Sequence, residues 1–332
     1  MSFSRYNTED SVISAESVVR GAWSSDSNQL STFQTASSYT EYYLDVYNGD
    51  PASSANSVQF SIQYGNLQGS GSTLINTNVP GLTPSRVVYG QYRNLVYGTE
   101  TTNFSFDNGT TTSNDIFVIN IARSRYKESL YPGSFNLTLG SGSNGFIKLT
   151  DDSSTTSLTR YIGENRVFYI ISGSNGTAYT AAASSSYYGM MFPDLDIIIL
   201  NASSSATVDL RNYFAPLTAA TASITPSNYN TIRLYNSILS GSSFQLKSEE
   251  TVSSRYFFTR IKNSEYNYTT NPSIIDANGN LLYSTLINNP QTYITSVGMY
   301  NDNNELLAVA KLSKPLTKDF TKEALIRIKL DY

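Results

Sequence analysis

Two acidic pairs are the residues of this chain whose spacing best suits catalysis. Asp194 and Asp196 are two positions apart, and Asp151 and Asp152 are adjacent. Residues at i and i+2 of a strand share a face, so Asp194 and Asp196 could converge like the paired carboxylates of a glycoside hydrolase. However, the aliphatic run at residues 197–200 indicates a loop that enters a strand. Isolated acidic pairs are common in proteins, so we predict that the chain is not an enzyme.

The chain contains no cysteine and no histidine in 332 residues. The absence of cysteine excludes disulfides, thiol catalysis and zinc–thiolate sites. The absence of histidine removes the usual general base near neutral pH and makes a Ser-His-Asp triad impossible. These two absences argue against most hydrolytic and transition-metal chemistry.

Two loops match ligand-binding motifs only in part. Residues 65–72 are rich in glycine, as phosphate-binding loops are, but they lack the lysine and the spacing of a P-loop. Residues 276–280 resemble the start of a calcium-binding loop, but the acidic ligand at the far end of an EF-hand is missing. A plain β-turn is the simpler interpretation of the second loop. We therefore predict no cofactor and no metal.

The composition departs from that of an ordinary enzyme. Charged residues make up 14% of the chain, against an average of about 25%. Aromatic residues reach 13%, with 26 tyrosines. Tyr, Thr and Val suit a pleated surface, so this composition is typical of β-rich structural or binding proteins. The net charge of −4 and the absence of a basic run argue against nucleic acid as a partner.

The sequence predicts neither a secretory signal nor a membrane span. The N-terminal residues 1–7 have no apolar signal core. The longest aliphatic run, at residues 197–200, is far shorter than the roughly 20 residues that a membrane helix needs. We expect synthesis in a host cytoplasm and no membrane partner.

The last forty residues are the most informative part of the chain. Apolar runs at residues 291–300 and 305–312 flank an Asn/Asp-rich connection, which predicts a β-hairpin. Apolar and charged residues then alternate at 326–330, the period of a strand with one wet face. The sequence therefore predicts a terminal three-strand unit without catalytic groups, suited to holding something in place.

Strands predominate in the rest of the chain. Apolar patterns predict them at residues 39–47, 58–64, 115–122, 135–139, 146–149, 166–171, 195–200, 244–246 and 255–261. The stretch 115–122 is apolar on both faces and should be central, whereas 146–149 and 166–171 look like a hairpin-like pair. Residues 84–98 predict a strand or a short helix. Residues 228–239 predict a helix, with Ser227 as its N-cap and Gly241 as its C-terminal stop.

These patterns predict a mainly β protein, with antiparallel β-sandwich or barrel domains, one or two short helices and an extended N-terminal arm. We expect four segments along the chain: an arm at residues 1–25, a β domain at 26–140, a β-rich middle domain at 141–250 with a helix near 228–239, and a C-terminal β domain at 251–332. The arm is either an edge strand with loops or an extension packed on a neighbouring subunit.

Three segments, at residues 3–7, 254–272 and 293–313, resemble virion structural proteins of T4-like, contractile-tailed phages that infect marine cyanobacteria. Residues 87–93 and 123–128 fit the same resemblance, and residues 140–225 are the least distinctive part. The terminal hairpin is similar, more loosely, to the module by which some tail-fibre proteins attach to a baseplate. That family is not defined by catalytic residues, so none is carried over.

The resemblance implies a non-enzymatic structural subunit of a contractile tail, a baseplate wedge component that acts through protein–protein interfaces. Its partners would be other tail and baseplate subunits in a multimeric assembly within the virion. The alternative is a receptor-binding or tail-fibre-like adhesin, or a fibre-attachment protein, because tyrosine also stacks on sugar rings. Trimeric fibres usually show sequence repeats, and none is found here.

Protein interfaces favour Tyr, Trp and Arg, which offer large contact areas and several hydrogen bonds. The chain concentrates these types in a few short segments. We predict that eight of them lie at subunit contacts or brace the elements that make such contacts: Trp23, Tyr89, Tyr92, Arg93, Arg125, Tyr126, Arg255 and Tyr256.

Overall fold

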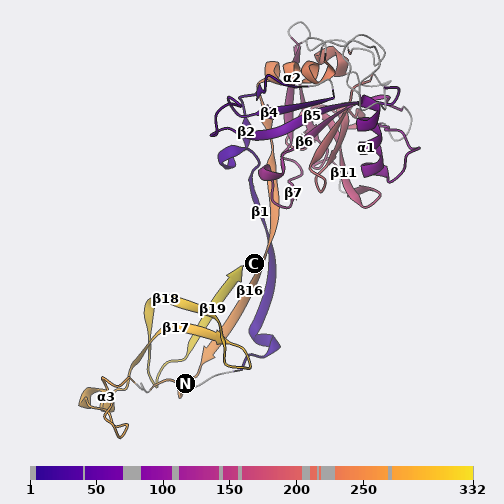
Figure 1. The fold of residues 1–332 in the computed structure, drawn as a ribbon. Helices are drawn as coiled ribbons and strands as arrows, with labels where there is room; N and C mark the ends of the chain where they lie inside the picture. The colour runs from indigo at the N-terminus through magenta and orange to yellow at the C-terminus, as the bar shows by residue number, and fades with distance from the viewer. Residues whose placement is uncertain are drawn as a thin grey trace. The chain divides into compact units, whose positions relative to one another are not determined.

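The structure is a computed structural model that describes residues 5–39, 42–69, 84–106, 112–141, 145–155, 159–203, 210–214, 217, 229–267 and 271–331. Within these residues the protein is mainly β, with a large curled antiparallel sheet and three α-helices. This confirms the predicted fold class. The chain divides into two compact units (Figure 1). Unit 1 comprises Met1–Glu16 and Thr251–Tyr332, and unit 2 comprises Ser17–Glu250.

Unit 2 is built on one antiparallel sheet. In spatial order its path runs β2, β15, β8, β9, β11, β13, β14, β6, β5, β4 and β3, and β10 and β12 also pair with β11. The bounds are β2 Gln29–Leu30, β3 Gln34–Thr35, β4 Tyr43–Tyr47, β5 Val58–Asn66, β6 Asp115–Ile121, β8 Asn136–Ser141, β9 Gly145–Asp151, β10 Arg160–Ile162, β11 Asn165–Ser174, β12 Thr177–Ala178, β13 Gly189–Phe192, β14 Ile197–Asn201 and β15 Phe244–Gln245. The predicted pairing of 146–149 with 166–171 is confirmed, because β9 and β11 are adjacent and antiparallel.

The sheet curls until strands that are far apart in its order face each other. Phe244 of β15 and Phe60 of β5 pack edge to face, with their ring centroids 5.2 Å apart. Trp23 packs against both rings, at 4.8 Å from Phe244 and 6.1 Å from Phe60. Because edge-to-face aromatic packing stabilises beyond the area it buries, this cluster holds the curled sheet closed in the manner of a barrel.

Strand β6 is central and buried on both faces, as the sequence predicts. Phe117 and Ile119 point into the larger core inside the curl. Ile116 and Val118 point the other way, into a second core that they share with helix α1, Ser85–Tyr97. Alternate residues of a strand face opposite sides, so an unbroken apolar run is stable only when both sides are covered. The 84–98 segment is thus a helix, which Gly98 ends in the left-handed region.

Helix α2, Asn230–Gly241, confirms the helix predicted near 228–239 and lies close to β4 and β5 (Figure 1). The expected N-cap Ser227 lies outside the described residues. Gly241 is the last helical residue, and Ser242 takes the left-handed cap at φ 53°. A Cβ at Gly241 would lie 1.9 Å from the Thr138 carbonyl oxygen of β8. Close approach of the helix to the sheet therefore requires glycine here.

Unit 1 contains the predicted hairpin, formed by β17, Thr292–Tyr300, and β18, Leu306–Lys318. The predicted strand at 326–330 is β19, Ala324–Asp331, but it pairs with β16, Lys247–Ile261, and not with the hairpin. The expected three-strand unit is therefore two sheets. The reason is that β16 offers β19 eight consecutive pairing positions, from Ser254 to Ile261.

The N-terminal segment forms β1, Ser11–Gly21, at the edge of the sheet ordered β1, β16 and β19, in which β7, Ser129–Leu130, also pairs with β16. Strands β1 and β16 contribute residues to both units. The short helix α3 is Ser284–Asn288, and the described residues also form 3-10 turns at Thr8–Asp10, Ser24–Asp26, Arg123–Arg125, Ala183–Ser185 and Leu210–Tyr213. No helix within the described ranges is long and apolar enough to cross a membrane.

The expected boundary between residues 140 and 141 falls within β8, and the strands on both sides of it share one sheet. Residues 26–140 and 141–250 thus belong to a single unit. Hydrogen bonding between distant strands leaves no mark in local composition, which is why the sequence suggested two domains there. The expected boundary at residue 251 coincides with the start of the second segment of unit 1.

Candidate interaction site

Unit 1 buries very few apolar side chains. Among its described residues, only Ile261 and Ile326 are buried hydrophobics, whereas both hydrophobic cores lie entirely in unit 2. Its large apolar residues that are more than half exposed are Val12, Ile13, Leu282, Tyr283, Ile287, Tyr293, Leu306, Leu307, Val309, Phe320 and Leu325. Burial of one such side chain contributes about 1.5–3 kcal/mol. Unit 1 therefore leaves a large part of its hydrophobic stabilisation unused.

The hairpin concentrates this exposure on one face. Leu307 and Val309 are 62% and 60% exposed, while their neighbours Ala308 and Ala310 are half-buried. Alternate residues share a face of a strand, so Leu307 and Val309 stand on the same open side of the sheet. Exposed apolar patches of this kind mark interaction surfaces.

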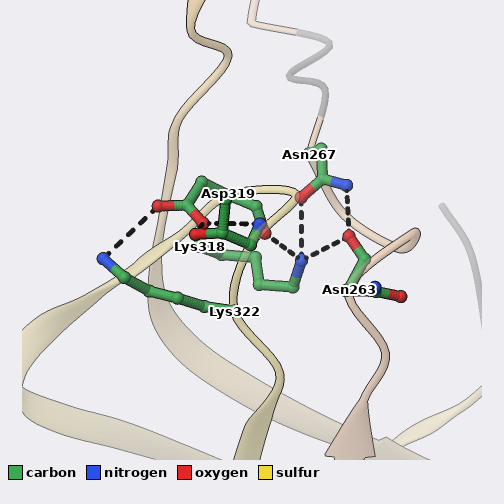
Figure 2. Close-up of polar contacts among 6 residues, drawn as sticks. Asn263, Asn267, Lys318, Asp319 and Lys322 are labelled. Atoms are coloured by element: carbon green, nitrogen blue, oxygen red, sulfur yellow. Dashed lines mark hydrogen bonds and ion pairs between the residues drawn. The ribbon is translucent and has the colours of Figure 1, made fainter.

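A buried lysine organises the base of the hairpin (Figure 2). Lys318, the last residue of β18, is fully buried. Its ammonium donates hydrogen bonds to the Asn263 carbonyl at 2.9 Å, to Asn267 Oδ1 at 2.8 Å and to the Asp319 carbonyl at 2.8 Å. All three donor positions of the ammonium are thus used. We call Lys318, with Asn263, Asn267 and Asp319, the Lys318 cluster.

The Lys318 cluster fastens the hairpin to the segment that follows β16. Thr292 is the cross-strand partner of Lys318, and its hydroxyl donates to the carbonyl of Tyr266 in that same segment. The Asp319 carboxylate accepts hydrogen bonds from the Thr321 amide and hydroxyl, which lower its pKa. Lys322 lies 3.3 Å from the same carboxylate. Polar contacts thus hold the hairpin base in a unit that has almost no apolar core.

Three of the eight predicted interface residues lie inside unit 2. Trp23, Tyr89 and Tyr92 are 2%, 0% and 3% exposed. Trp23 donates its indole N–H to the Phe244 carbonyl at 2.9 Å. Tyr89 donates to the Ser113 carbonyl at 2.7 Å and accepts from the Phe104 amide. In the described structure these residues act by bracing the cores.

The other three predicted residues of unit 2 are half-buried. Arg93 donates to Asn103 at 3.2 Å, and its guanidinium lies over the Tyr89 ring. Arg125 donates to the Ser24 hydroxyl at 2.8 Å. Tyr126 packs against the larger core and lies under the guanidinium of Arg123. Their remaining exposed surface is compatible with a contact, which stays a prediction.

The two predicted residues of unit 1 lie on β16 and are also half-buried. The Arg255 guanidinium lies over the Phe257 ring, at 5.8 Å from its centroid. The Tyr256 ring carries the guanidinium of Arg327 at 5.3 Å. Cation–π contacts of this kind fix the ring and the cation together. Both residues therefore stabilise the sheet formed by β1, β16 and β19.

The acidic pairs singled out in the sequence are engaged in structural contacts. Asp151 is buried and accepts the Gly133 amide at 2.9 Å; burial raises its pKa. Asp152 is paired with Arg160, and Asp194 forms a bidentate pair with Arg166. Among the described residues no three Asp, Glu, His or Cys side chains gather closely enough to hold a metal ion.

Asp196 is the one acidic residue of these pairs with a buried carboxylate oxygen that accepts no hydrogen bond in the described structure. Its side chain is buried, its φ is 57°, and its Oδ1 has no hydrogen-bond partner in the described structure. Burial raises its pKa from 3.8 to about 7, although a hydrogen bond from Tyr126 and the charge of Arg123 oppose that shift. The charge of Asp194 adds to the rise. Near neutral pH this carboxylate therefore titrates.

We expect Asp196→Asn to make unit 2 less sensitive to pH. Because the folded pKa is raised, the stability that protonated Asp196 contributes is complete below about pH 4 and is lost as pH rises through about 7. The neutral amide avoids the buried charge, and asparagine tolerates the positive φ. The melting temperature, followed by Trp23 fluorescence, should rise relative to wild type at pH 8 and change little at pH 4.

Glu100→Gln is the control for this measurement. It removes one acidic charge at an exposed position of unit 2 that does not act on Asp196, and should change the melting temperature little at both pH values. A gain at pH 8 in the control, or none in Asp196→Asn, would show that Asp196 is not the group responsible.

Sequence reasoning missed the residues that carry the site. The run Leu306–Ala310 contains three large apolar side chains and two alanines with no polar residue between them, which predicts apolar side chains on both faces of the hairpin. That signal was sufficient to find the exposed face. No local signal marks Lys318, because a lysine at the end of an amphipathic strand is ordinarily solvated.

Comparisons with known proteins assign this chain to no group: no protein-family description, curated protein or solved structure matches it.

Proposed function

We propose that this protein is a non-enzymatic structural subunit of a contractile phage tail, a baseplate component that acts through protein–protein interfaces. One observation carries the proposal: unit 1 exposes its apolar side chains and buries only Ile261 and Ile326 among its described residues. A chain segment with so small a core gains its stability from neighbours. The sequence resemblance to virion proteins of contractile-tailed phages supports the same role.

The roles of the two units follow from this proposal. Unit 2 has two packed cores and serves as the rigid body of the subunit. Unit 1 presents the hairpin, whose base is fixed by the Lys318 cluster while its face remains open. Because its base is already fixed, the hairpin loses little conformational entropy when a partner binds to its open face.

A second candidate is an adhesin that binds host glycans. Tyr161 and Tyr179 of unit 2 are 60% and 58% exposed, and exposed rings can stack on sugars. Binding of the purified chain to a glycan array, lost in Tyr161→Ala or Tyr179→Ala, would favour this candidate. An assembly subunit should give no such signal.

Cross-linking mass spectrometry on purified virions tests the assembly role. Lysine-reactive cross-linkers should join Lys311, Lys314 and Lys329 of unit 1 to other tail proteins. Lys127 of unit 2, which is also exposed, provides the comparison within the same chain. Absence of the protein from particles, or cross-links confined to the chain itself, would refute the proposal.

A further inference from the structure

Unit 1 contains an open cleft of about 380 Å³ between β18 and β19. One residue of β17, five consecutive residues of β18 and four consecutive residues of β19 line it. Consecutive residues of a strand point to opposite faces. A cleft lined by consecutive residues therefore runs along the edges of these strands rather than over one face of a sheet.

Both strands are terminal in their described sheets. Strand β18 pairs with β17 alone, and β19 pairs with β16 alone. The hairpin register is also interrupted beside the cleft: Ile294 faces Leu316 and Ser296 faces Lys311, so residues 312–315 lie opposite the single residue Thr295. This bulge takes the main chain of residues 312–315 out of the β17 register. Open strand edges of this kind accept an added strand.

The lining of the cleft is cationic and apolar. Its four charged residues are Lys311, Lys314, Arg327 and Lys329, and none of its lining residues is acidic. Within the described chain, Lys311 and Lys314 are exposed and form no ion pair, whereas Lys329 lies 3.2 Å from Asp331 and 3.9 Å from Glu16. The floor between these cations is apolar, formed by residues that include Val297, Leu312 and Ile328.

We propose that this cleft binds an extended segment of another protein in which acidic and apolar side chains alternate. The segment lies along the edges of β18 and β19 as an added strand, with main-chain hydrogen bonds to those edges. Its acidic side chains meet Lys311, Lys314 and Arg327, and its apolar side chains cover the floor. The inference rests on the proposed assembly role and names the chemistry of one partner.

The charge pattern distinguishes this occupant from two others. The phosphates of a nucleic acid strand could contact the cations of the cleft. Its bases, however, would find no aromatic ring to stack on, because the lining contains no aromatic residue. A second copy of this chain could offer Glu16 of β1, but β1 is already paired with β16. Both are outcomes of the experiment below.

The probe is a fluorescein-labelled, eight-residue peptide in which Glu and Val alternate, measured by fluorescence anisotropy against the full chain. A matched peptide with Lys in place of Glu tests charge. A third peptide, N-methylated at alternate residues, tests main-chain pairing. The Glu/Val peptide should bind, and the other two should bind at least about tenfold more weakly, because each loses either the ionic or the main-chain contacts.

The double variant Lys311→Glu with Lys314→Glu should weaken binding of the Glu/Val peptide by on the order of tenfold or more. Its control is Lys127→Glu with Lys262→Glu, which changes the net charge equally at exposed lysines outside the cleft. The control should bind within about twofold of wild type, and circular dichroism should show that both variants are folded.

Equal binding of the Glu and Lys peptides, or indifference to the cleft variant, would overturn the proposal. Displacement of the peptide by single-stranded DNA that itself depends on Lys311 and Lys314 would overturn it in favour of nucleic acid. Self-association that depends on these lysines, without peptide binding, would overturn it in favour of a second copy. The cross-linking of whole particles is independent of this assay, so failure of one does not imply failure of the other.

Discussion

Replacing Lys318 with methionine is expected to destabilise unit 1 by roughly 2–4 kcal/mol and to leave unit 2 intact. Methionine keeps the aliphatic volume but removes three donors, and hydrogen bonds to a charged group contribute about 1.5–3 kcal/mol each. Asn267 Oδ1 would lose its donor, while the Asn263 and Asp319 carbonyls would each keep one other. The net loss is therefore smaller than the sum of three bonds.

Hydrogen exchange followed by mass spectrometry can localise this effect. Amides of the hairpin, β17 and β18, should exchange faster in Lys318→Met, because the Lys318 cluster fastens their base. The only tryptophan, Trp23, lies in unit 2, so its fluorescence melting curve reports the intact unit and should not move.

Lys322→Met is the control for the buried lysine. Lys322 also contacts Asp319, at 3.3 Å, but its side chain is 59% exposed. Exposed ion pairs contribute about 0–1 kcal/mol, so exchange in the hairpin should change little. Equal protection of the hairpin in wild type and Lys318→Met would show that the buried ammonium does not hold it.

Phe244→Ala is expected to destabilise unit 2 by about 3–5 kcal/mol, the range for removing a buried phenylalanine. Phe244 is fully buried and its ring contacts Trp23, Phe60 and Phe135 at centroid distances of 4.8, 5.2 and 5.8 Å. Strands β15 and β5 are far apart in the sheet order, so the substitution removes the aromatic contact that closes the curled sheet.

Urea denaturation followed by Trp23 fluorescence measures this loss directly. The midpoint should fall, and the native emission should shift to longer wavelength because the cavity lies beside the indole. Phe146→Ala removes a phenylalanine that is 68% exposed and should change the free energy of unfolding by less than about 0.5 kcal/mol. If the two variants were equally stable, the aromatic contact would not be closing the sheet.

Parts of the fold whose signals are local could be predicted from the sequence. The run at 115–122 has no polar face, so β6 had to be covered on both sides. The Asn/Asp connection between two apolar runs specified the hairpin of β17 and β18. Both inferences need only the pattern of apolar and polar residues along a strand, and this pattern can be read from consecutive residues of the sequence.

Which strands pair, and which side chains are buried, was decided by the tertiary structure. Strand β19 pairs with β16, about 70 residues away in sequence, because pairing depends on which edge is available. Trp23 and Tyr89 suit an interface and a core equally well, since both reward large rings with one polar atom. The structure buries both of them.

By itself, then, the sequence determined that the protein is β-rich, lacks thiol and imidazole chemistry, and contains a hairpin with apolar faces in its last forty residues. The tertiary structure alone decided that this hairpin stays uncovered in unit 1 and that Lys318 is buried at its base. The physical reason is that composition and periodicity are properties of neighbours along the chain. Burial, and the hydrogen bonds of the Lys318 ammonium to Asn263 and Asn267, depend on segments that only folding brings together.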